Sequence, residues 1–265
     1  MTGIIDFHTH AFPDAIAQRA MSSLEHGAST KAFLDGRLTS LIASMDRSGI
    51  EKSVVCSIAT KPSQFEPILS WSEEVRSERI IPLLSIHPDD VDYAEKIRIV
   101  GREGFKGIKM HPYYQDFNID DDRMLRIYEA VLKENLMVVM HTGFDIAFKR
   151  IRRADPAGIL DIAERFPGLK FVATHLGAWE QWHEVETVLA GKPVYMELSF
   201  ALEYLDRAPV REIILKHPKE YLLFGTDSPW TDQQKTLELF RSLKLGEDID
   251  MAVLRDNAER LIGPV

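Results

Sequence analysis

The stretch from Gly3 to Asp14, GIIDFHTHAFPD, begins as a buried strand and ends with two histidines one residue apart. Ile4 and Ile5 suit a core, whereas an imidazole is costly to bury unless it is hydrogen-bonded or bound to a metal. Because residues i and i+2 of a strand point to the same face, we expect His8 and His10 to face one point. Two convergent imidazoles suit a metal ion, so the rest of the chain should supply further ligands.

Seven more short apolar runs follow, and most of them precede a helical pattern. The runs are rich in Val, Ile and Leu without clean polar alternation, which is typical of parallel strands buried on both faces. After the first long gap they begin about 25 to 35 residues apart, the size of a repeating strand–helix unit. The eight runs begin at Gly3, Ser53, Ile80, Lys106, Leu136, Lys170, Val194 and Tyr221.

The segments between the runs carry the sequence features of helices. Between Asp120 and Leu136, apolar residues recur at i, i+3, i+4 and i+7. Gly49 follows LTSLIASMDRS, where a helix C-terminus favours glycine. Asp155 stands at the expected N-cap of another helix, with Pro156 at its first position.

Eight strands alternating with helices predict a single (β/α)8 TIM barrel over residues 1–265, with no separate N-terminal domain. An open doubly wound sheet is the alternative fold. That fold is expected to carry a glycine-rich nucleotide-binding motif after its first strand, and histidines stand there instead. We therefore favour the barrel.

The composition bears on the kind of partner. The formal net charge is −9 and the sequence pI is about 5.5. These values argue against nucleic acid and anionic membrane surfaces, which attract basic proteins, and they favour a small-molecule substrate. The 45% of hydrophobic residues is enough for a large core, and no apolar run approaches the roughly 18 residues of a membrane span.

The single cysteine, Cys56, excludes an internal disulfide and suits a reducing compartment. Strand-like sequence begins by Gly3, so we expect no signal peptide. Both features predict a cytoplasmic protein.

Polar side chains stand at the carboxyl ends of the predicted strands, where TIM barrels build their active sites. Seven of the nine histidines belong to this set or lie near it, and only His26 and His217 have no place in it. The strand ends carry His8, His10, Cys56, His87, Lys109, His111, His141, His175, Glu197 and Asp227.

A single histidine after a strand is more often structural than a ligand, and we interpret His87, His183 and His217 in that way. The stronger signal is agreement among several strand ends. Histidines end strands one, five and six, and an aspartate ends strand eight.

The chain resembles the amidohydrolase superfamily, and within it the amidohydrolase-related (amidohydrolase 2) branch of compact TIM-barrel proteins. That branch includes lactonases, other hydrolases and metal-dependent decarboxylases. The similarity covers nearly the whole chain. It rests on the motifs IIDFHTH, MDRSGIEKSVV, IHPDD, GFKGIKMHP, VVMHTG, FPGLKFVATHLG, LLFGTDSPW and DNAERLI, in this order.

The resemblance implies a metal-dependent enzyme with one divalent ion. Zinc suits three nitrogens and a carboxylate, and manganese, iron and cobalt stay open as alternatives. Lys109 stands near the place of the residue that bridges two metals in binuclear relatives, but its KMHP context is not that of an evident bridge. His175 would be a ligand, or would polarise the substrate or orient water. The implied metal ligands are His8, His10, His141 and Asp227.

The implied chemistry is activation of water. Zinc at an open site lowers the pKa of bound water from about 15.7 to about 7. Asp227 would accept a proton from the water and pass it to the leaving group, while His175 would help to stabilise the oxyanion.

Lys109 and His111 share a strand face, and we expect them to hold a substrate carboxylate or carbonyl oxygen. The alternative for Lys109 is a buried ion pair with Glu197. Three tryptophans follow strands six and eight. Trp179, Trp182 and Trp230 would line the pocket or pack loop against loop, and we favour packing.

The leading hypothesis is a hydrolase that acts on an amide, ester or lactone of a small molecule, either neutral or anionic. The alternative enzyme is a non-oxidative decarboxylase of an aromatic or unsaturated acid, which needs the same ligands. A third hypothesis is a barrel that binds a ligand without catalysis, although binding alone does not require this ligand set. A homodimer would be ordinary for the branch.

Overall fold

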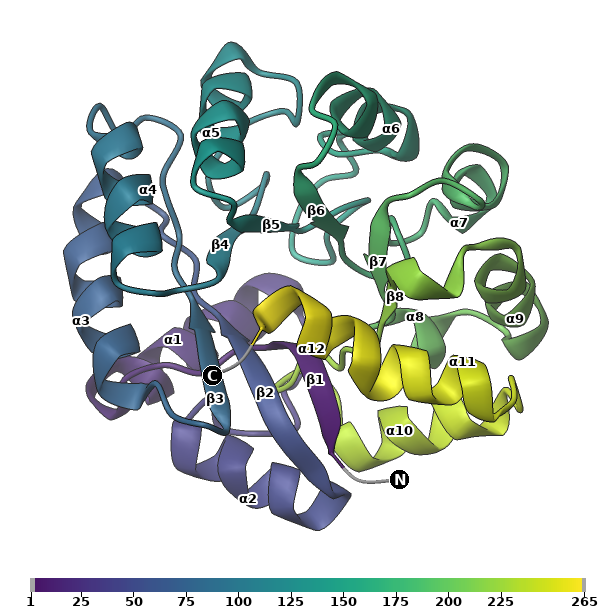
Figure 1. Cartoon of the computed structure of the whole chain (residues 1–265). Coiled ribbons are helices and arrows are strands. Elements are labelled where there is room, and N and C mark those ends of the chain that lie inside the picture. Colours follow the sequence, from purple (N-terminus) through teal and green to yellow (C-terminus); the bar gives the residue numbers. More distant parts are fainter. Residues whose placement is uncertain (1–2, 264–265) are drawn as a thin grey trace.

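The computed structural model describes residues 3–263 of the chain. Eight strands lie at the centre of a ring of helices (Figure 1). Every neighbouring pair of strands within a sheet is parallel. The strands are β1 (Ile4–Thr9), β2 (Ile50–Cys56), β3 (Ile80–Leu83), β4 (Gly107–Met110), β5 (Met137–Met140), β6 (Lys170–Ala173), β7 (Tyr195–Glu197) and β8 (Leu222–Leu223).

The strands form a closed barrel. The hydrogen-bonded order is β1-β2-β3 in one sheet and β4-β5-β6-β7-β8 in the other. A parallel bridge between Leu84 and Ile108 joins the sheets beyond β3, and a second bridge between Thr9 and Ser228 joins β8 back to β1. The predicted TIM barrel is confirmed, and the open sheet is excluded.

Helices fill the connections between the strands. Those before β5 are α1 (Asp14–Ala28), α2 (Leu38–Ser48), α3 (Phe65–Val75), α4 (Tyr93–Arg102) and α5 (Asp122–Lys133). Those after β5 are α6 (Pro156–Arg165), α7 (Trp182–Glu184), α8 (Ala201–Tyr204), α9 (Arg207–Lys216), α10 (Gln233–Ser242), α11 (Glu247–Met251) and α12 (Asn257–Ile262).

The helix ends follow the local signals in the sequence. Gly49 ends α2 with a φ of 68°, in the left-handed region that glycine enters freely. The carboxylate of Asp155 accepts a hydrogen bond from the amide of Gly158 (2.9 Å) and so caps α6. The apolar positions predicted for α5 are the ones that it buries.

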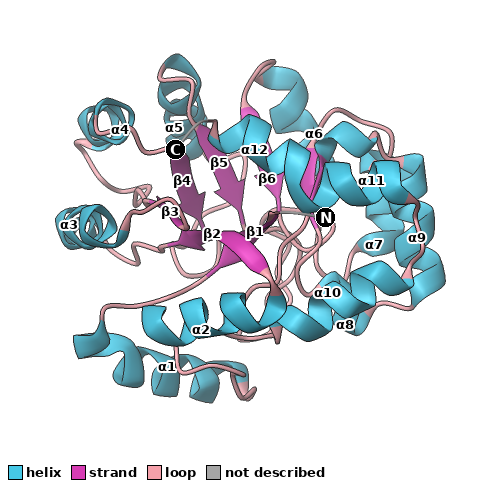
Figure 2. Cartoon of the chain, turned by 60° about the horizontal axis from the view of Figure 1, so that its bottom comes forward, coloured by secondary structure: helices cyan, strands magenta, loops and turns pink. Residues whose placement is uncertain are grey.

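The first connection holds two helices, which explains the long gap after the first apolar run. Helix α2 packs against β2, and α1 lies outside it (Figure 2). Met21 and Leu24 of α1 nevertheless reach the pocket at the carboxyl ends of the strands. The extra helix therefore helps to build the site.

The amino-terminal half of the barrel is filled with apolar side chains from alternate strand positions. Helix α12 crosses this end (Figure 1) and adds Ala258, Leu261 and Ile262 to the cluster. Side chains at i and i+2 of each strand share a face, so the interior receives every second residue. The strands contribute Ile5, Phe7, Val54, Cys56, Ile81, Leu83, Met137, Val139, Val172 and Leu223.

An irregularity in β1 divides this packed half from the site. Ile5 and Phe7 point into the apolar cluster. The pairing of β1 with β2 then shifts within residues 6–9. His8 and His10 follow one position out of phase with Ile5 and Phe7, and both line the pocket. Such bulges re-aim side chains next to active sites.

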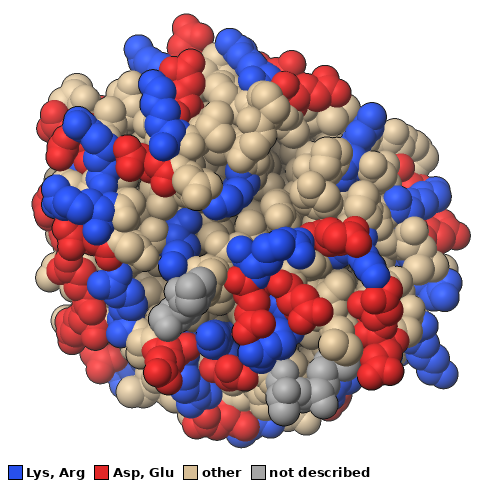
Figure 3. Space-filling view, in the orientation of Figure 1, with Lys and Arg blue, Asp and Glu red and all other residues tan. Residues whose placement is uncertain are grey.

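No helix within residues 3–263 is both long enough and apolar enough to span a lipid bilayer. On the face shown in Figure 3, acidic and basic side chains intermingle around the rim. The net negative charge is therefore not gathered into one patch on this face.

Candidate active site

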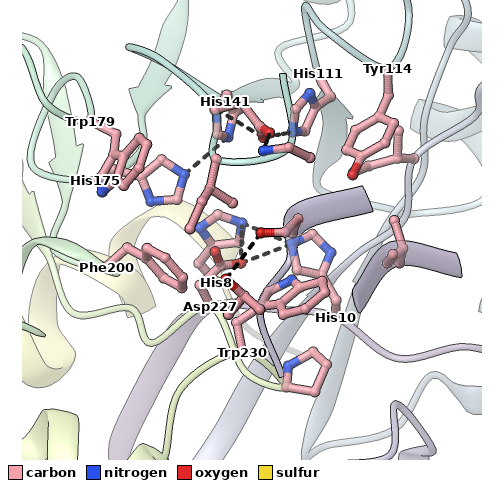
Figure 4. A pocket seen from close by; sticks show the side chains of 18 of the residues that line it. His8, His10, His111, Tyr114, His141, His175, Trp179, Phe200, Asp227 and Trp230 are labelled. Atoms are coloured by element: carbon pink, nitrogen blue, oxygen red, sulfur yellow. Dashed lines mark hydrogen bonds and ion pairs between the residues drawn. The ribbon is translucent and has the colours of Figure 1, made fainter. Parts of the chain in front are cut away.

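One pocket at the carboxyl ends of the strands is lined by all seven residues to which the sequence assigned a metal-binding, catalytic or substrate-binding role (Figure 4). The other strand-end residues, Cys56, His87 and Glu197, are outside its lining. Its floor is polar and its walls are mainly apolar. The floor consists of His8, His10, Lys109, His111, His141, Asp145, His175 and Asp227. The walls include Phe12, Met21, Leu24, Ile58, Tyr114, Ile146, Trp179, Phe200, Pro229 and Trp230.

His8, His10 and Asp227 meet where β8 closes the barrel against β1. The Nε2 atoms of His8 and His10 are 3.1 Å apart. The Oδ1 atom of Asp227 lies 3.1 Å from Nε2 of His10 and 3.5 Å from Nε2 of His8. A backbone hydrogen bond from the amide of Asp227 to the carbonyl of His8 (2.7 Å) fixes the two strand ends together. The predicted convergence of the two histidines is therefore present.

His141 and His175 form a second pair across the floor. The Nε2 atom of His175 lies 3.0 Å from Nδ1 of His141. The ring of His111 stacks on that of His141 with centroids 4.1 Å apart. Nε2 of His111 is 3.4 Å from the Oδ2 atom of Asp145. In Figure 4 this group lies across the pocket from His10 and Asp227.

Glu197 holds His8 from outside the pocket. Nδ1 of His8 donates to the Oε1 atom of Glu197 at 2.9 Å. The same carboxylate accepts hydrogen bonds from the amide of Ser199 (2.8 Å), from its hydroxyl (2.7 Å) and from the amide of His175 (2.9 Å). Gly225 makes room for it, because a Cβ there would lie 2.1 Å from Oε2.

Three other histidines of the floor are each held by a backbone carbonyl oxygen on the outer side. A carbonyl only accepts, so the proton must be on the nitrogen that faces it. In a neutral ring, the nitrogen that faces the pocket is then left with a lone pair. The contacts are Nδ1 of His10 to Cys56 (2.7 Å), Nδ1 of His175 to Ser199 (3.2 Å) and Nε2 of His141 to Phe144 (3.0 Å).

The ring nitrogens that face the pocket are therefore hydrogen-bond acceptors that lie close to other acceptors. Burial, as the main cause, lowers the pKa of His8, His141 and His175 well below its usual value, which keeps these rings neutral near pH 7. Neutral imidazole nitrogens 3.0–3.1 Å apart, with a carboxylate oxygen 3.1–3.5 Å from two of them, repel unless a cation lies among them. The Lys109 ammonium offers such a charge to His8 alone among these histidines, with Nζ 2.9 Å from its Nε2. Histidines that bind metals commonly donate their other nitrogen to a carboxylate or carbonyl, as these do. The donor set fits a divalent cation.

Lys109 brings a positive charge to the floor. Its side chain is buried, and Nζ lies 2.9 Å from Nε2 of His8. Burial lowers the pKa of Lys109. The alternative considered for Lys109, an ion pair with Glu197, is not formed, because that carboxylate is engaged by His8 and Ser199 instead. Lys109 is the one lysine or arginine among the residues that line the pocket.

Three groups of residues within 3–263 could each hold a metal ion: His8, His10 and Asp227; His8, His175 and Glu197; and His111, His141 and Asp145. The first contains three of the four metal ligands implied by the sequence. His141, the fourth, lies in the third group, and His175 stands between it and His8 with ring centroids 4.8 Å and 5.4 Å away. The joint set of four stays a prediction.

Sequence reasoning missed Asp145 and Ser199. Asp145 follows His141 by four residues, on the loop after β5, and faces both His111 and His141. Ser199 follows Glu197 by two residues, and this spacing could have indicated a shared face.

The tryptophans divide between the two expected roles. Trp179 and Trp230 line the pocket. Trp179 fills both roles, because it is buried and its ring also packs against Phe200 and Tyr204. Trp182 supports the loop after β6, because its Nε1 donates to the carbonyl of His175 (3.0 Å).

The remaining histidines lie away from the pocket lining, as expected. Nε2 of buried His217 contacts the carbonyl of Val194 at 2.9 Å, and Nδ1 of His87 accepts from the amide of Asp89 at 3.2 Å. His26 and His183 are exposed on helices.

A profile of the amidohydrolase family matches residues 5–263, nearly the whole chain. The chain belongs to the amidohydrolase family. No curated protein sequence matches it closely enough to count as a relative.

Solved structures show the same fold at low sequence identity. An uncharacterised TIM-barrel protein from Bordetella bronchiseptica has a TM-score of 0.79 and 20% identity, with 98% of each chain covered. A 5-carboxyvanillate decarboxylase from Novosphingobium aromaticivorans with bound manganese has a TM-score of 0.71 and 14% identity, with 99% of this chain and 97% of that chain covered. A putative 2-pyrone-4,6-dicarboxylic acid hydrolase from Pseudomonas putida has a TM-score of 0.69 and 16% identity, with 99% and 98% covered.

Proposed function

We propose that this amidohydrolase-family member is a metal-dependent hydrolase that activates water to attack an amide, ester or lactone of a small molecule. The observation that carries the proposal is the convergence of lone-pair atoms on the pocket floor. The inward atoms of His8, His10 and Asp227 lie within 3.1–3.5 Å of one another, and Nε2 of His8 also lies 2.9 Å from the Lys109 ammonium. A divalent cation held by these atoms would relieve the repulsion among their lone pairs.

The proposed ligands of one divalent ion are His8, His10, His141 and Asp227. His175 lies against His141 and is either a further ligand or a donor toward the substrate. Zinc suits this set, and manganese, iron or cobalt would also fit it. When bound, the ion would polarise the scissile carbonyl and make a nearby water more acidic.

Asp227 is the proposed general base. It borders the pocket, and its carboxylate has one oxygen beside His10 and a second that can face water. A carboxylate in this place can take a proton from the attacking water and deliver it to the leaving group.

Lys109 and His111 are the proposed substrate-binding groups. The Lys109 ammonium is the one lysine or arginine charge in the lining, so it can donate to an oxyanion or a substrate carboxylate. Nδ1 of His111 is buried without a hydrogen-bond partner, and the ring lines the pocket. A substrate oxygen would satisfy it.

Replacing Asp227 with asparagine tests the proposal. With the metal-loaded enzyme and a panel of lactones, esters and amides, D227N should lower kcat/KM by about 10²–10⁴-fold, the usual contribution of a general base. The matched control is D120N at an exposed carboxylate, which should leave activity unchanged. Undiminished hydrolysis by metal-loaded D227N would remove Asp227 as the base.

Decarboxylation of an aromatic or unsaturated acid is the second candidate. Two features support it: the aromatic and apolar walls around the floor, and the fold shared with the 5-carboxyvanillate decarboxylase that carries manganese. Measuring carbon dioxide release against acid release over a panel of aryl acids and lactones separates the two reactions. Release of carbon dioxide without hydrolysis would favour the decarboxylase.

The proposed partner is a small molecule, and the cytoplasm is the proposed compartment. The single cysteine, Cys56, is buried and free, which suits that compartment. A homodimer stays a proposal that sedimentation analysis would test.

A further inference from the structure

A second cavity adjoins the pocket between α1 and the segment that follows β2. We call it the α1 groove. His10, Phe12, Leu24, Ile58 and Tyr114 line both cavities. Figure 4 shows His10 and Tyr114 on the same side of the pocket, opposite Trp179 and Phe200. The remaining lining of the α1 groove includes Ile16 and Ala20 of α1 and Ile68 and Trp71 of α3.

The two cavities differ in size. The pocket has a free volume of about 100 Å³, whereas the α1 groove has about 480 Å³. Sites for small molecules usually measure about 300–1,000 Å³. The pocket alone therefore accommodates a reacting group, and the α1 groove has the space for the larger part of a ligand.

The α1 groove is also chemically distinct from the pocket floor, because none of its lining residues is Asp, Glu, Lys or Arg. The side-chain oxygen of Gln64 already accepts hydrogen bonds from the amides of Thr60 (2.6 Å) and Lys61 (3.2 Å). Burial raises the pKa of Cys56 to about 12, so its thiol stays protonated and is a poor nucleophile. These properties suit an apolar ligand group.

One large hydrophobic side chain of the lining is exposed to solvent: Ile16 of α1, at 39%. An apolar group bound in the α1 groove would lie against Ile16, Ile68 and Trp71 and would remove their surface from water, which is favourable by the hydrophobic effect.

We infer that the α1 groove is a subsite for an alkyl chain of several carbons on the substrate. The carboxyl-derived group at the head of that substrate lies in the pocket at His8, His10 and Lys109, and the chain passes the shared wall at His10 and Tyr114. This inference rests on the proposed function only in placing the head group in the pocket. It narrows the substrate class to amphiphilic esters, lactones or amides with one polar end.

Binding of straight-chain carboxylates tests the subsite without catalysis. Isothermal titration calorimetry of the metal-loaded wild type should show tighter binding from acetate to decanoate, by up to about fourfold for each added methylene. That factor corresponds to ~0.8 kcal/mol per buried CH₂. Ala20→Trp should fill the α1 groove, abolish the dependence on chain length and leave acetate within about twofold of the wild type.

The matched control is Ala15→Trp, which places the same indole on an exposed position of α1 outside the groove lining. It should keep the full dependence on chain length. Thermal unfolding of both variants checks that they are folded. Wild-type affinity that does not change with chain length would overturn the subsite, and so would an Ala20→Trp variant that behaves like Ala15→Trp.

The outcomes separate the subsite from the proposed reaction. Binding that depends on chain length, without turnover of any ester, lactone or amide, supports the subsite and rejects the hydrolase. Turnover of short esters, together with carboxylate affinities that do not change with chain length, supports the hydrolase and rejects the subsite. If sedimentation shows that Ala20→Trp converts a wild-type dimer to a monomer while the length dependence persists, the groove is an interface between copies and the subsite is rejected.

Discussion

The two ends of the barrel are built on the same strands and differ in chemistry. On β5, Met137 and Val139 pack in the apolar half, and His141 follows two residues later on the pocket floor. On β1, Ile5 and Phe7 are packed, and histidines follow after the shift in register. The height of a residue along the strand, and not the strand itself, decides whether it supports the fold or the chemistry.

The two ends are also stabilised by different forces. The amino-terminal half of the barrel, the lower end, is stabilised by apolar burial, at about 25 cal/mol per Å² of apolar surface removed from water. The carboxyl ends of the strands with the pocket floor are the upper end. The upper end buries imidazoles, a lysine and carboxyl groups, which lose hydration and are held by specific hydrogen bonds instead. Substitutions in the apolar half should therefore change the free energy of unfolding, whereas substitutions at the pocket floor should change metal content and activity.

The largest expected effect is loss of the metal from the upper end. H8A and H10A each remove one of the convergent nitrogens, and each should lose nearly all bound metal and all hydrolytic activity while the fold persists. Elemental analysis of purified protein measures the metal content. H26A, at an exposed histidine of α1, is the control and should keep it. Full metal content in both variants would move the metal site elsewhere.

At the lower end, M137A should unfold the protein more easily and leave the site intact. Met137 is fully buried, and truncating a buried methionine to alanine usually costs about 2–5 kcal/mol. Urea denaturation measures the loss, and metal content should not change. M251A, at a methionine that is 44% exposed, should cost far less. A drop in metal content with unchanged stability in M137A would contradict the division of the two ends.

The outer support of the site should have an intermediate effect. E197Q keeps the shape of the side chain but removes the charge that accepts from Nδ1 of His8. Such supporting changes usually weaken metal binding by about 10–100-fold. Competition with a chelator measures the affinity, and E129Q, at an exposed glutamate, is the control. Equal affinities in E197Q and the wild type would show that the carboxylate does not tune His8.

The smallest expected effect is on the pH dependence of stability of the metal-free protein. Burial lowers the pKa of His111 in the fold, whereas the unfolded chain takes up its proton near 6.5. Its contribution to stability is therefore present above pH 6.5 and is lost as the pH falls. H111Q should reduce the slope of unfolding free energy between pH 6.5 and 5.5 by up to about 1.36 kcal/mol per pH unit. Identical slopes in urea titrations would mean that His111 takes up a proton in the fold.

The pattern of apolar runs was sufficient to predict the barrel. A strand buried on both faces carries its signal locally, and so do the end of α2 at Gly49 and the cap of α6 at Asp155. Strand length was less well predicted. β8 spans only Leu222–Leu223, because the chain beyond it bonds to β1 through isolated contacts.

The site was predicted as a set of residues but not as a network. Strand periodicity gives the face of each side chain and leaves open which distant group it meets. The pairing of Glu197 with His8, rather than with Lys109, depends on the space that Gly225 leaves beside it. The contact between His141 and His175 depends on loops whose carbonyls orient both rings. The α1 groove has no sequence signal, because its walls come from segments that are separate in the chain.

The position of α1 bears on how such a barrel diversifies. This helix borders both cavities, yet α2 is the helix that packs on the strand that follows. A lineage could exchange α1 as a module, or lengthen it, and acquire new selectivity while the strands and their histidines were inherited unchanged. Relatives that share the chemistry but accept different substrates would then show their largest sequence differences between residues 14 and 28.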